Sequence, residues 1–225
     1  MIRLGVLASG GGTNLQVLLD ACAARRVDAE VALVLSNVPG AGALERAARS
    51  GVASACLPSK GVADRAGYDE SVVARLREAG VELVCLAGYM RLVTPSFLRA
   101  FGPTSGSRGC PRVVNIHPAL LPAFPGLHGA RQALEAGVKL AGCTVHFVDE
   151  GTDTGPVIAQ AAVPVLDGDT EATLAARILE QEHLLYPQAI QWIAQGRLSL
   201  EGRRVRLDHT TPPSERLRSP AVELA

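Results

Sequence analysis

The sequence has few aromatic residues and no excess of charge of either sign. Phe, Trp and Tyr make up 4% of its 225 residues, and 22 Lys and Arg balance 22 Asp and Glu. Proteins that bind nucleic acid through its phosphates carry a basic face, so this balance argues against nucleic acid as a partner. The chain is long enough to bury a sizeable core without metal or disulfide staples.

Long apolar runs are also missing. No stretch approaches the roughly 18 residues of a membrane span, and the chain opens on an apolar strand rather than on the regions of a secretory signal. We therefore expect no membrane partner and a cytoplasmic location. Cysteine is scarce and never occurs as Cys-x-x-Cys, which fits reduced thiols packed as small apolar side chains. The five cysteines are Cys22, Cys56, Cys85, Cys110 and Cys143.

Apolar runs alternate with segments of helical period along the first half. Strands are predicted at 3–8, 31–35, 53–57, 83–87 and 113–116, and helices at 14–24, 43–50, 68–79 and 95–101. Strands that are almost continuously apolar are typical of a parallel sheet with helices on both faces. The alternation predicts βαβ units and an α/β fold with a doubly wound, mostly parallel sheet.

The second half changes character after Pro118. A helix at 130–136 and two longer strands at 141–148 and 157–165 are predicted, followed by a long helix from about Thr170 that Pro187 should kink or end. Residues 102–111 are rich in turn formers and predict a surface loop. We expect a domain at 1–200 with a phosphate-binding half at 1–101 and a catalytic half at 112–200. The extension at 201–225 is expected to be partly disordered.

The first strand leads into Ser9-Gly-Gly-Gly-Thr-Asn14 and then a helix. Successive glycines let backbone amides point together at an anion beside the helix N-terminus, which predicts phosphate binding. Leu15 stands where the dinucleotide fingerprint has its third glycine, and no lysine follows Gly12 as a nucleoside triphosphate loop requires. A phosphomonoester is thus favoured over NAD or ATP. The alternative is a tight turn that binds nothing.

Asn115-Ile-His-Pro118 stands at the end of a predicted strand. Alternation puts the Asn115 and His117 side chains on one face, at the edge of the sheet where ligands bind in open α/β folds. An amide donor beside a proton-transfer group suits carbonyl chemistry. The alternative is a structural histidine, which we also expect for most of the others: His128, His146, His183 and His209.

A third motif, 149–156, is a turn between two strands with three carboxylates. A polar hairpin loop would explain it without a function. It lacks the spacing of a calcium loop, and the chain shows no zinc spacing of Cys or His, so we expect no metal site.

Four separated motifs together resemble the phosphoribosylglycinamide formyltransferase family, over residues 1 to about 197. They are Ser9-Gly-Gly-Gly-Thr-Asn-Leu-Gln16, Leu86-Ala-Gly-Tyr-Met-Arg91, Asn115-Ile-His-Pro-Ala-Leu-Leu-Pro122 and Asp149-Glu-Gly-Thr-Asp-Thr-Gly-Pro156. Two features depart from the family pattern: Ala130 replaces a histidine that some members carry, and 102–111 looks like an insertion.

The resemblance implies transfer of the formyl group of 10-formyltetrahydrofolate to the amine of glycinamide ribonucleotide, in purine biosynthesis and without a metal. Asn115 would stabilise the oxyanion, and His117 would do so as a cation or pass a proton. Asp153 would hold the imidazole and help to deprotonate the amine. The resemblance assigns Gly12, Thr13, Asn14 and Glu182 to the ribonucleotide, and Arg65, Met90, Arg91, Leu92 and Val148 to the folate.

Other formyl-folate enzymes stay open as alternatives. Methionyl-tRNA formyltransferases and formyltetrahydrofolate hydrolases share the Asn-x-His and Asp, but we expect both to carry an additional domain. A non-catalytic nucleotide or folate-binding module would use the same crevice without needing all three residues. A homodimer is compatible with the resemblance.

Overall fold

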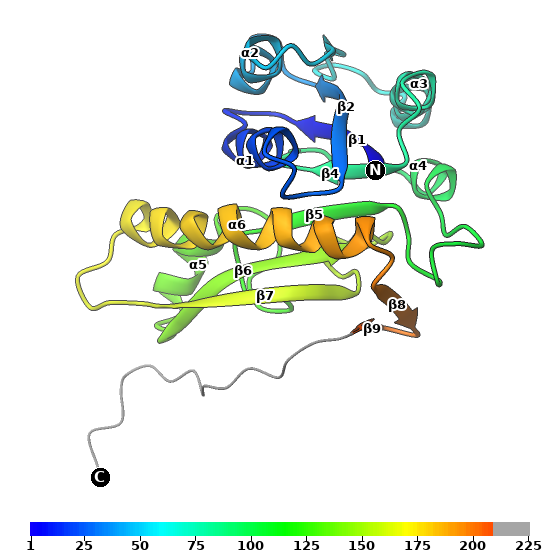
Figure 1. The fold of residues 1–225 in the computed structure, drawn as a ribbon. Helices are drawn as coiled ribbons and strands as arrows, with labels where there is room; N and C mark the ends of the chain where they lie inside the picture. Colours follow the sequence, from blue (N-terminus) through cyan, green and yellow to red (C-terminus); the bar gives the residue numbers. More distant parts are fainter. Residues whose placement is uncertain (209–225) are drawn as a thin grey trace.

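A seven-stranded sheet forms the centre of the computed structural model, which describes residues 1–208 (Figure 1). Its strand order is β3-β2-β1-β4-β5-β6-β7, and β1 to β5 are parallel. These strands are β1 (Ile2–Ala8), β2 (Ala29–Ser36), β3 (Ser54–Cys56), β4 (Leu83–Leu86) and β5 (Val113–His117). The predicted mostly parallel sheet is confirmed.

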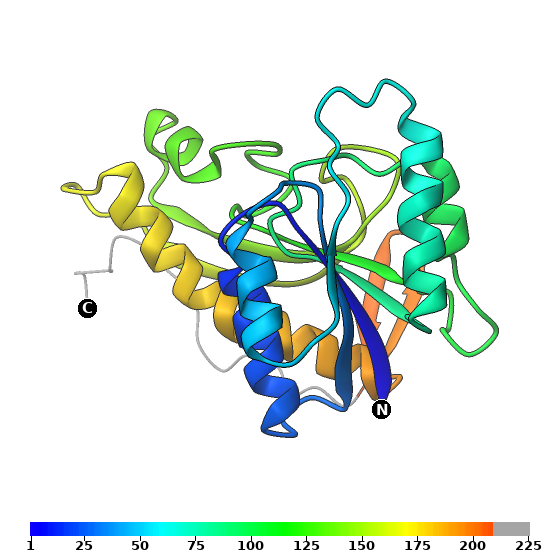
Figure 2. The ribbon, with the colours of Figure 1, turned by 90° about the horizontal axis from the view of Figure 1, so that it is seen from above.

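Helices cover both faces of the sheet, as the apolar strands predicted. In Figure 2, α1 (Thr13–Ala23), α2 (Gly42–Arg49) and α6 (Glu171–Ala194) lie on one side, while α3 (Arg65–Glu78) and α4 (Pro95–Ala100) lie on the other. Two apolar clusters fill these layers: Leu15 and Ile178 belong to the first, and Leu76 and Phe97 to the second.

The second half completes the sheet with antiparallel strands. The strand β6 (Leu140–Phe147) pairs with β5, and β7 (Val157–Pro164) pairs with β6 at the edge. The short helix α5 (Gly129–Glu135) precedes them, and Thr170 caps α6 through its hydroxyl. Of the two outcomes predicted for Pro187, a kink or an end of the helix, the end does not occur. The helix continues to Ala194 because Pro187 and its neighbours Tyr186 and Ala189 are buried, so packing outweighs one lost backbone hydrogen bond.

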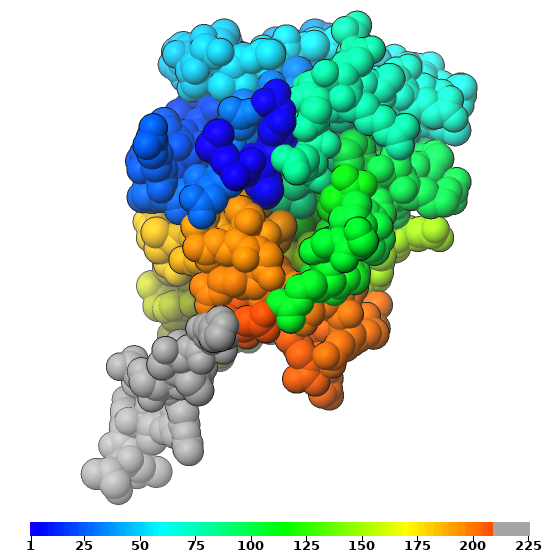
Figure 3. All heavy atoms as spheres, turned by 45° about the vertical axis from the view of Figure 1, so that its right-hand side comes forward, coloured from blue at the N-terminus to red at the C-terminus, as the bar shows by residue number. Residues whose placement is uncertain are grey.

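A β-hairpin that the sequence pattern did not predict follows α6. It consists of β8 (Leu198–Glu201) and β9 (Arg204–Leu207), and the domain boundary predicted at residue 200 falls inside it. The loop 102–111 has no helix or strand, as predicted, and it lies against this hairpin (Figure 3). The amide of Leu200 donates to the carbonyl of Arg108 at 3.1 Å. Residues 209–225, which include most of the predicted extension and His209, lie outside the described part.

The cysteines within residues 1–208 are all free thiols. Cys85, Cys110 and Cys143 are buried, and the other two are half-buried. Burial raises the pKa of the Cys143 thiol to about 12, which keeps it protonated. In the same part of the chain, we find no helix that is both long and apolar enough to cross a membrane.

Candidate active site

The loops that follow β1, β4 and β5 meet at one edge of the sheet. These three strands are parallel neighbours, so their carboxyl ends lie together. The strand order reverses between β1 and β4, and a ligand crevice is expected at such a reversal. The glycine loop 9–14, the loop 88–93 and the end of β5 therefore converge from distant parts of the sequence.

Asn115, His117 and Asp153 come together at this edge. Asp153 lies in the loop between β6 and β7, and its Oδ2 is 3.4 Å from His117 Nδ1. The other ring nitrogen, Nε2, is 3.0 Å from the carbonyl oxygen of Phe124. A carbonyl only accepts, so His117 Nε2 carries a hydrogen, while Nδ1 faces a carboxylate. The ring is buried, and its two nitrogens face these two oxygen atoms.

The backbone conformation and a backbone amide fix the position of the Asp153 side chain. Its φ is 55°, a left-handed conformation that aspartate tolerates better than most residues. Asp153 Oδ2 also accepts a hydrogen bond from the Gly126 amide at 2.8 Å. Earlier in the loop, Asp149 Oδ1 accepts from the Gly151 amide at 3.1 Å and the Thr154 hydroxyl at 2.6 Å. Within the acidic motif, Asp149 thus stabilises the loop, whereas Asp153 faces His117.

His146 belongs to the same group, although the sequence pattern favoured a structural role for it. Its Nε2 lies 3.1 Å from the side-chain nitrogen of Asn115 and 3.7 Å from Asp153 Oδ1, and its Nδ1 lies 2.8 Å from the carbonyl of Phe147. Burial lowers the pKa of His146, so the neutral ring donates through Nδ1 and accepts from Asn115 through Nε2. The second Asn115 N–H is left for the pocket.

The pairing of β5 with β6 is what brings His146 here. Asn115 and His146 are register partners across these antiparallel strands. The sequence pattern did not establish that pairing, so a lone histidine in an apolar strand gave no signal. Asn115 and His117 were predicted to share a strand face because side chains alternate along a strand.

The glycine loop lines a cavity of about 260 Å³ with Ala87, Gly88 and Met90. Gly12, at the N-terminus of α1, has a φ of 73°, and a Cβ there would lie 2.8 Å from the Cα of Ala43. Only glycine suits this position. The Asn14 side chain does not stand free in the loop: its Nδ2 donates to Glu182 Oε2 at 2.7 Å.

Glu182 and Asn14 form a buried polar pair between α6 and α1. Burial raises the pKa of Glu182, and the hydrogen bond from Asn14 opposes this. Asn14 Oδ1 is buried and has no hydrogen-bond partner among the described residues. A buried acceptor without a partner is costly, so this oxygen marks a place for a ligand N–H or O–H group.

The loop 88–93 forms a wall shared by two cavities. Met90, which the resemblance assigns to the folate, lines the glycine-loop cavity. Arg91, Leu92 and Val148 line a second cavity of about 70 Å³ with Asn115, His146 and Asp153. Arg65 lies outside that lining, and its guanidinium donates to the carbonyl of Leu92 at 2.8 Å. It thus touches the wall from α3.

Arg91 is the cationic side chain of this wall. Its guanidinium carbon lies 4.3 Å from the centre of the Tyr68 ring, and its Nε lies 3.9 Å from Asp69 Oδ1. Nε and Nη2 are buried without a hydrogen-bond partner among residues 1–208. Two such N–H groups suit a carboxylate ligand.

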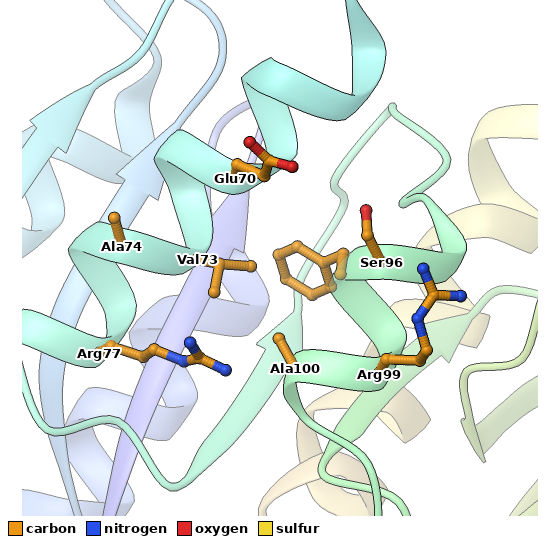
Figure 4. Close-up of a pocket in the computed structure, with 8 residues that line it drawn as sticks. Glu70, Val73, Ala74, Arg77, Ser96, Arg99 and Ala100 are labelled. Carbon is orange, nitrogen blue, oxygen red and sulfur yellow. The ribbon is translucent and has the colours of Figure 1, made fainter.

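A cavity of about 460 Å³, larger than the two above, lies in the groove between α3 and α4 (Figure 4). Its lining includes Glu70, Arg77, Ser96, Phe97 and Arg99. It holds none of the Asn, His and Asp groups described above. We therefore place the candidate active site at the strand ends and not in the larger groove. In the described part, no three His, Cys, Asp or Glu side chains gather as metal ligands would.

Comparison with known proteins decides the family. The profile of the family described as "Formyl transferase" matches residues 2–190. The chain belongs to the formyl transferase family. This formyl transferase is 41% identical to phosphoribosylglycinamide formyltransferase of Escherichia coli over 214 residues, which cover 95% of this chain and 97% of that protein.

Longer proteins and solved structures agree with this. The formyl transferase is 50% identical over 198 residues to the trifunctional purine biosynthetic protein adenosine-3 of Drosophila pseudoobscura pseudoobscura. The match covers 87% of this chain but only 14% of that protein, so the chain corresponds to a small part of it. The crystal structure of glycinamide ribonucleotide transformylase 1 from Symbiobacterium toebii superposes with a TM-score of 0.86 at 55% identity, over 92% of this chain and 94% of that one.

Proposed function

We propose that this formyl transferase moves the formyl group of 10-formyltetrahydrofolate to the amine of glycinamide ribonucleotide, a step of purine biosynthesis. The products are formylglycinamide ribonucleotide and tetrahydrofolate. The observation that carries the proposal is the meeting of Asn115, His117 and Asp153 beside two cavities that share one wall. The names of the similar proteins support this acceptor.

The cavity beside the glycine loop suits the ribonucleotide. The backbone amides of Gly12 and Thr13 lie at the N-terminus of α1, which favours a phosphate. The paired Asn14 and Glu182 would receive the hydroxyl groups of the ribose, since Asn14 Oδ1 lacks a partner and a carboxylate accepts hydrogen bonds. Met90 would close this cavity from the side of the wall.

The cavity that holds Asn115 suits the folate, which supplies the formyl group. Val148 and the backbone up to Asp153 would contact the pterin ring. A cavity of about 70 Å³ is smaller than a folate, so the remainder would extend past the exposed Leu92. The unpartnered N–H groups of Arg91 fit the carboxylates of the folate glutamate, and Arg65 supports the same loop through Leu92.

Three side chains would carry the chemistry. The free N–H of Asn115 donates to the formyl oxygen as that oxygen gains negative charge, a contact typically worth about 10²- to 10³-fold in rate. Once its Nε2 turns away from the Phe124 carbonyl, His117 would stabilise the same oxygen or pass a proton to the folate nitrogen as that nitrogen leaves. Asp153 keeps the His117 ring oriented and accepts, directly or through water, the proton that leaves the attacking amine. His146 orients Asn115 by accepting its other N–H.

An absorbance assay tests the proposal. The purified protein is given 10-formyltetrahydrofolate alone, with glycinamide ribonucleotide, or with charged initiator methionyl-tRNA, and the formation of tetrahydrofolate is followed. We expect turnover only with the ribonucleotide, loss of turnover in His117→Ala, and normal turnover in His128→Ala, which alters an exposed histidine paired with Glu171. Equal turnover without an acceptor would replace the transferase with a hydrolase, and turnover with only the tRNA would replace the acceptor.

A further inference from the structure

Ser9 is the residue of the glycine loop that contacts the shared wall, and it lies outside the groups that carry the chemistry. It is the first residue after β1, and its backbone amide donates to the carbonyl of Gly88 at 3.0 Å. Its hydroxyl oxygen accepts from the backbone amide of Met90 at 2.8 Å. Ser9 thus contacts the wall on both sides of Tyr89, once through its backbone and once through its side chain.

The hydroxyl of Ser9 belongs to a chain of hydrogen bonds with one direction. The Met90 amide can only donate, so the Ser9 oxygen accepts there and its own hydrogen goes to Asn37 Oδ1 at 2.5 Å. Asn37 is buried, and its Nδ2 donates to the Ser59 hydroxyl at 3.0 Å. The Ser59 amide donates back to the Asn37 carbonyl at 3.1 Å. Asn37, which follows β2, therefore fixes the orientation of the Ser9 hydroxyl.

The wall needs such a support because two of its side chains are largely exposed to solvent. Met90 is 65% exposed and Leu92 55% exposed, and Gly88 bends the chain with a φ of 69°. On the far side, Arg91 rests on the Tyr68 ring, and Arg65 donates to Leu92. On the near side, Ser9 supplies its two hydrogen bonds to Gly88 and Met90. A shift of this loop would move Met90 in one cavity and Tyr89, Arg91 and Leu92 in the other.

We propose that Ser9 is a positioning residue whose hydroxyl holds the wall 88–93 and so couples the occupancy of the two cavities. A ligand in the glycine-loop cavity contacts Met90 and restricts the wall. The second ligand then meets a wall that is already ordered, so it loses less conformational freedom on binding. The identity of the two ligands rests on the proposed function, but the role of the Ser9 hydroxyl does not.

The first test needs no ligand. Amide hydrogen exchange is measured by NMR on the full chain as wild type, Ser9→Ala, Ser9→Thr and Ser107→Ala. We expect the Met90 amide to exchange about tenfold faster in Ser9→Ala, because it loses its acceptor, and at the wild-type rate in Ser9→Thr, which keeps a hydroxyl. Ser107→Ala is the matched control, since its hydroxyl bonds to Thr104 within the loop 102–111. Unchanged exchange of Met90 in Ser9→Ala overturns the proposal.

The second test measures coupling by calorimetry with glycinamide ribonucleotide and tetrahydrofolate, a pair that cannot react. Each Kd is determined with and without the other compound, and the coupling factor must be the same in both directions. In wild type, we expect each compound to lower the Kd of the other. In Ser9→Ala both Kd values should rise about three- to tenfold, as expected for one hydrogen bond, and the coupling factor should approach one. Asn37→Ala should show a smaller effect, since Ser9 could still accept from Met90.

The outcomes separate this proposal from the proposed function. Coupling that is absent in wild type, or that survives in Ser9→Ala, overturns the role of Ser9. A rise in only one Kd also overturns it, because the wall would then serve a single cavity. If wild type binds neither compound, the proposed function fails, and the exchange of the Met90 amide still decides whether the Ser9 hydroxyl holds the wall.

Discussion

Replacing His146 with leucine removes the hydrogen-bond acceptor that faces the Asn115 amide. The two side-chain nitrogens are 3.1 Å apart, and the His146 ring is buried. Leucine has a similar volume but no polar atom, so the Asn115 N–H that pointed at His146 is left without a partner. Asn115 is half-buried, so losing this partner should cost about 1 kcal/mol of unfolding free energy, the lower end of the range for buried donors. For a chain of this size, the melting temperature should fall by several degrees.

The catalytic effect should exceed the effect on binding. Deleting a donor that stabilises developing charge costs about 10²- to 10³-fold in rate. In His146→Leu the donor remains but loses the bond that orients it, so we expect kcat to fall about 10- to 100-fold, with KM for the ribonucleotide unchanged. His146→Gln places an oxygen near the position of Nε2 and should recover most of this loss.

Steady-state kinetics of wild type, His146→Leu, His146→Gln and His128→Leu decide the question. His128→Leu controls for the loss of a histidine, since its side chain is more than half exposed and contacts Glu171 at 3.4 Å. Circular dichroism shows whether each variant is folded. A folded His146→Leu protein with kcat within about twofold of wild type would refute the argument that His146 orients Asn115.

The same geometry sets expectations for other side chains and for pH. His117→Ala should abolish most turnover in a folded protein, and near-normal kcat would remove its catalytic role. Asp153→Asn should lower kcat more than it weakens folate binding, whereas a change confined to KM would make Asp153 a binding residue. Gly11→Val should raise KM for glycinamide ribonucleotide and leave tetrahydrofolate affinity unchanged; Gly11 is chosen because a Cβ added there would meet no atom within 4 Å, unlike one at Gly12. Burial lowers the pKa of His146 in the folded protein. As the pH falls, the unfolded chain therefore takes up a proton at His146 before the folded protein does. The free energy of unfolding should decrease as the pH drops below about 6.5, and it should decrease less in His146→Gln.

The sequence by itself determined the parallel half of the fold. The strand β4 is apolar throughout, β1 is apolar except for Arg3, and the helices between them have a clear period, so local pattern and burial agree. The glycine loop and the strand-end pair Asn115 and His117 were also readable, because each depends on residues close in sequence. The turn formers of 102–111 likewise marked a loop correctly.

Only the tertiary structure decided which distant groups meet. His146 reaches Asn115 through the register of two antiparallel strands, and Met90 faces the glycine loop because β1 and β4 are neighbours. The helix α6 continues past Pro187 and the hairpin β8–β9 forms because both are packed against other elements, which no local pattern records. Side-chain direction follows from strand pairing and packing, so the composition of the two cavities and the position of Ser9 between them could not be derived from the order of residues alone.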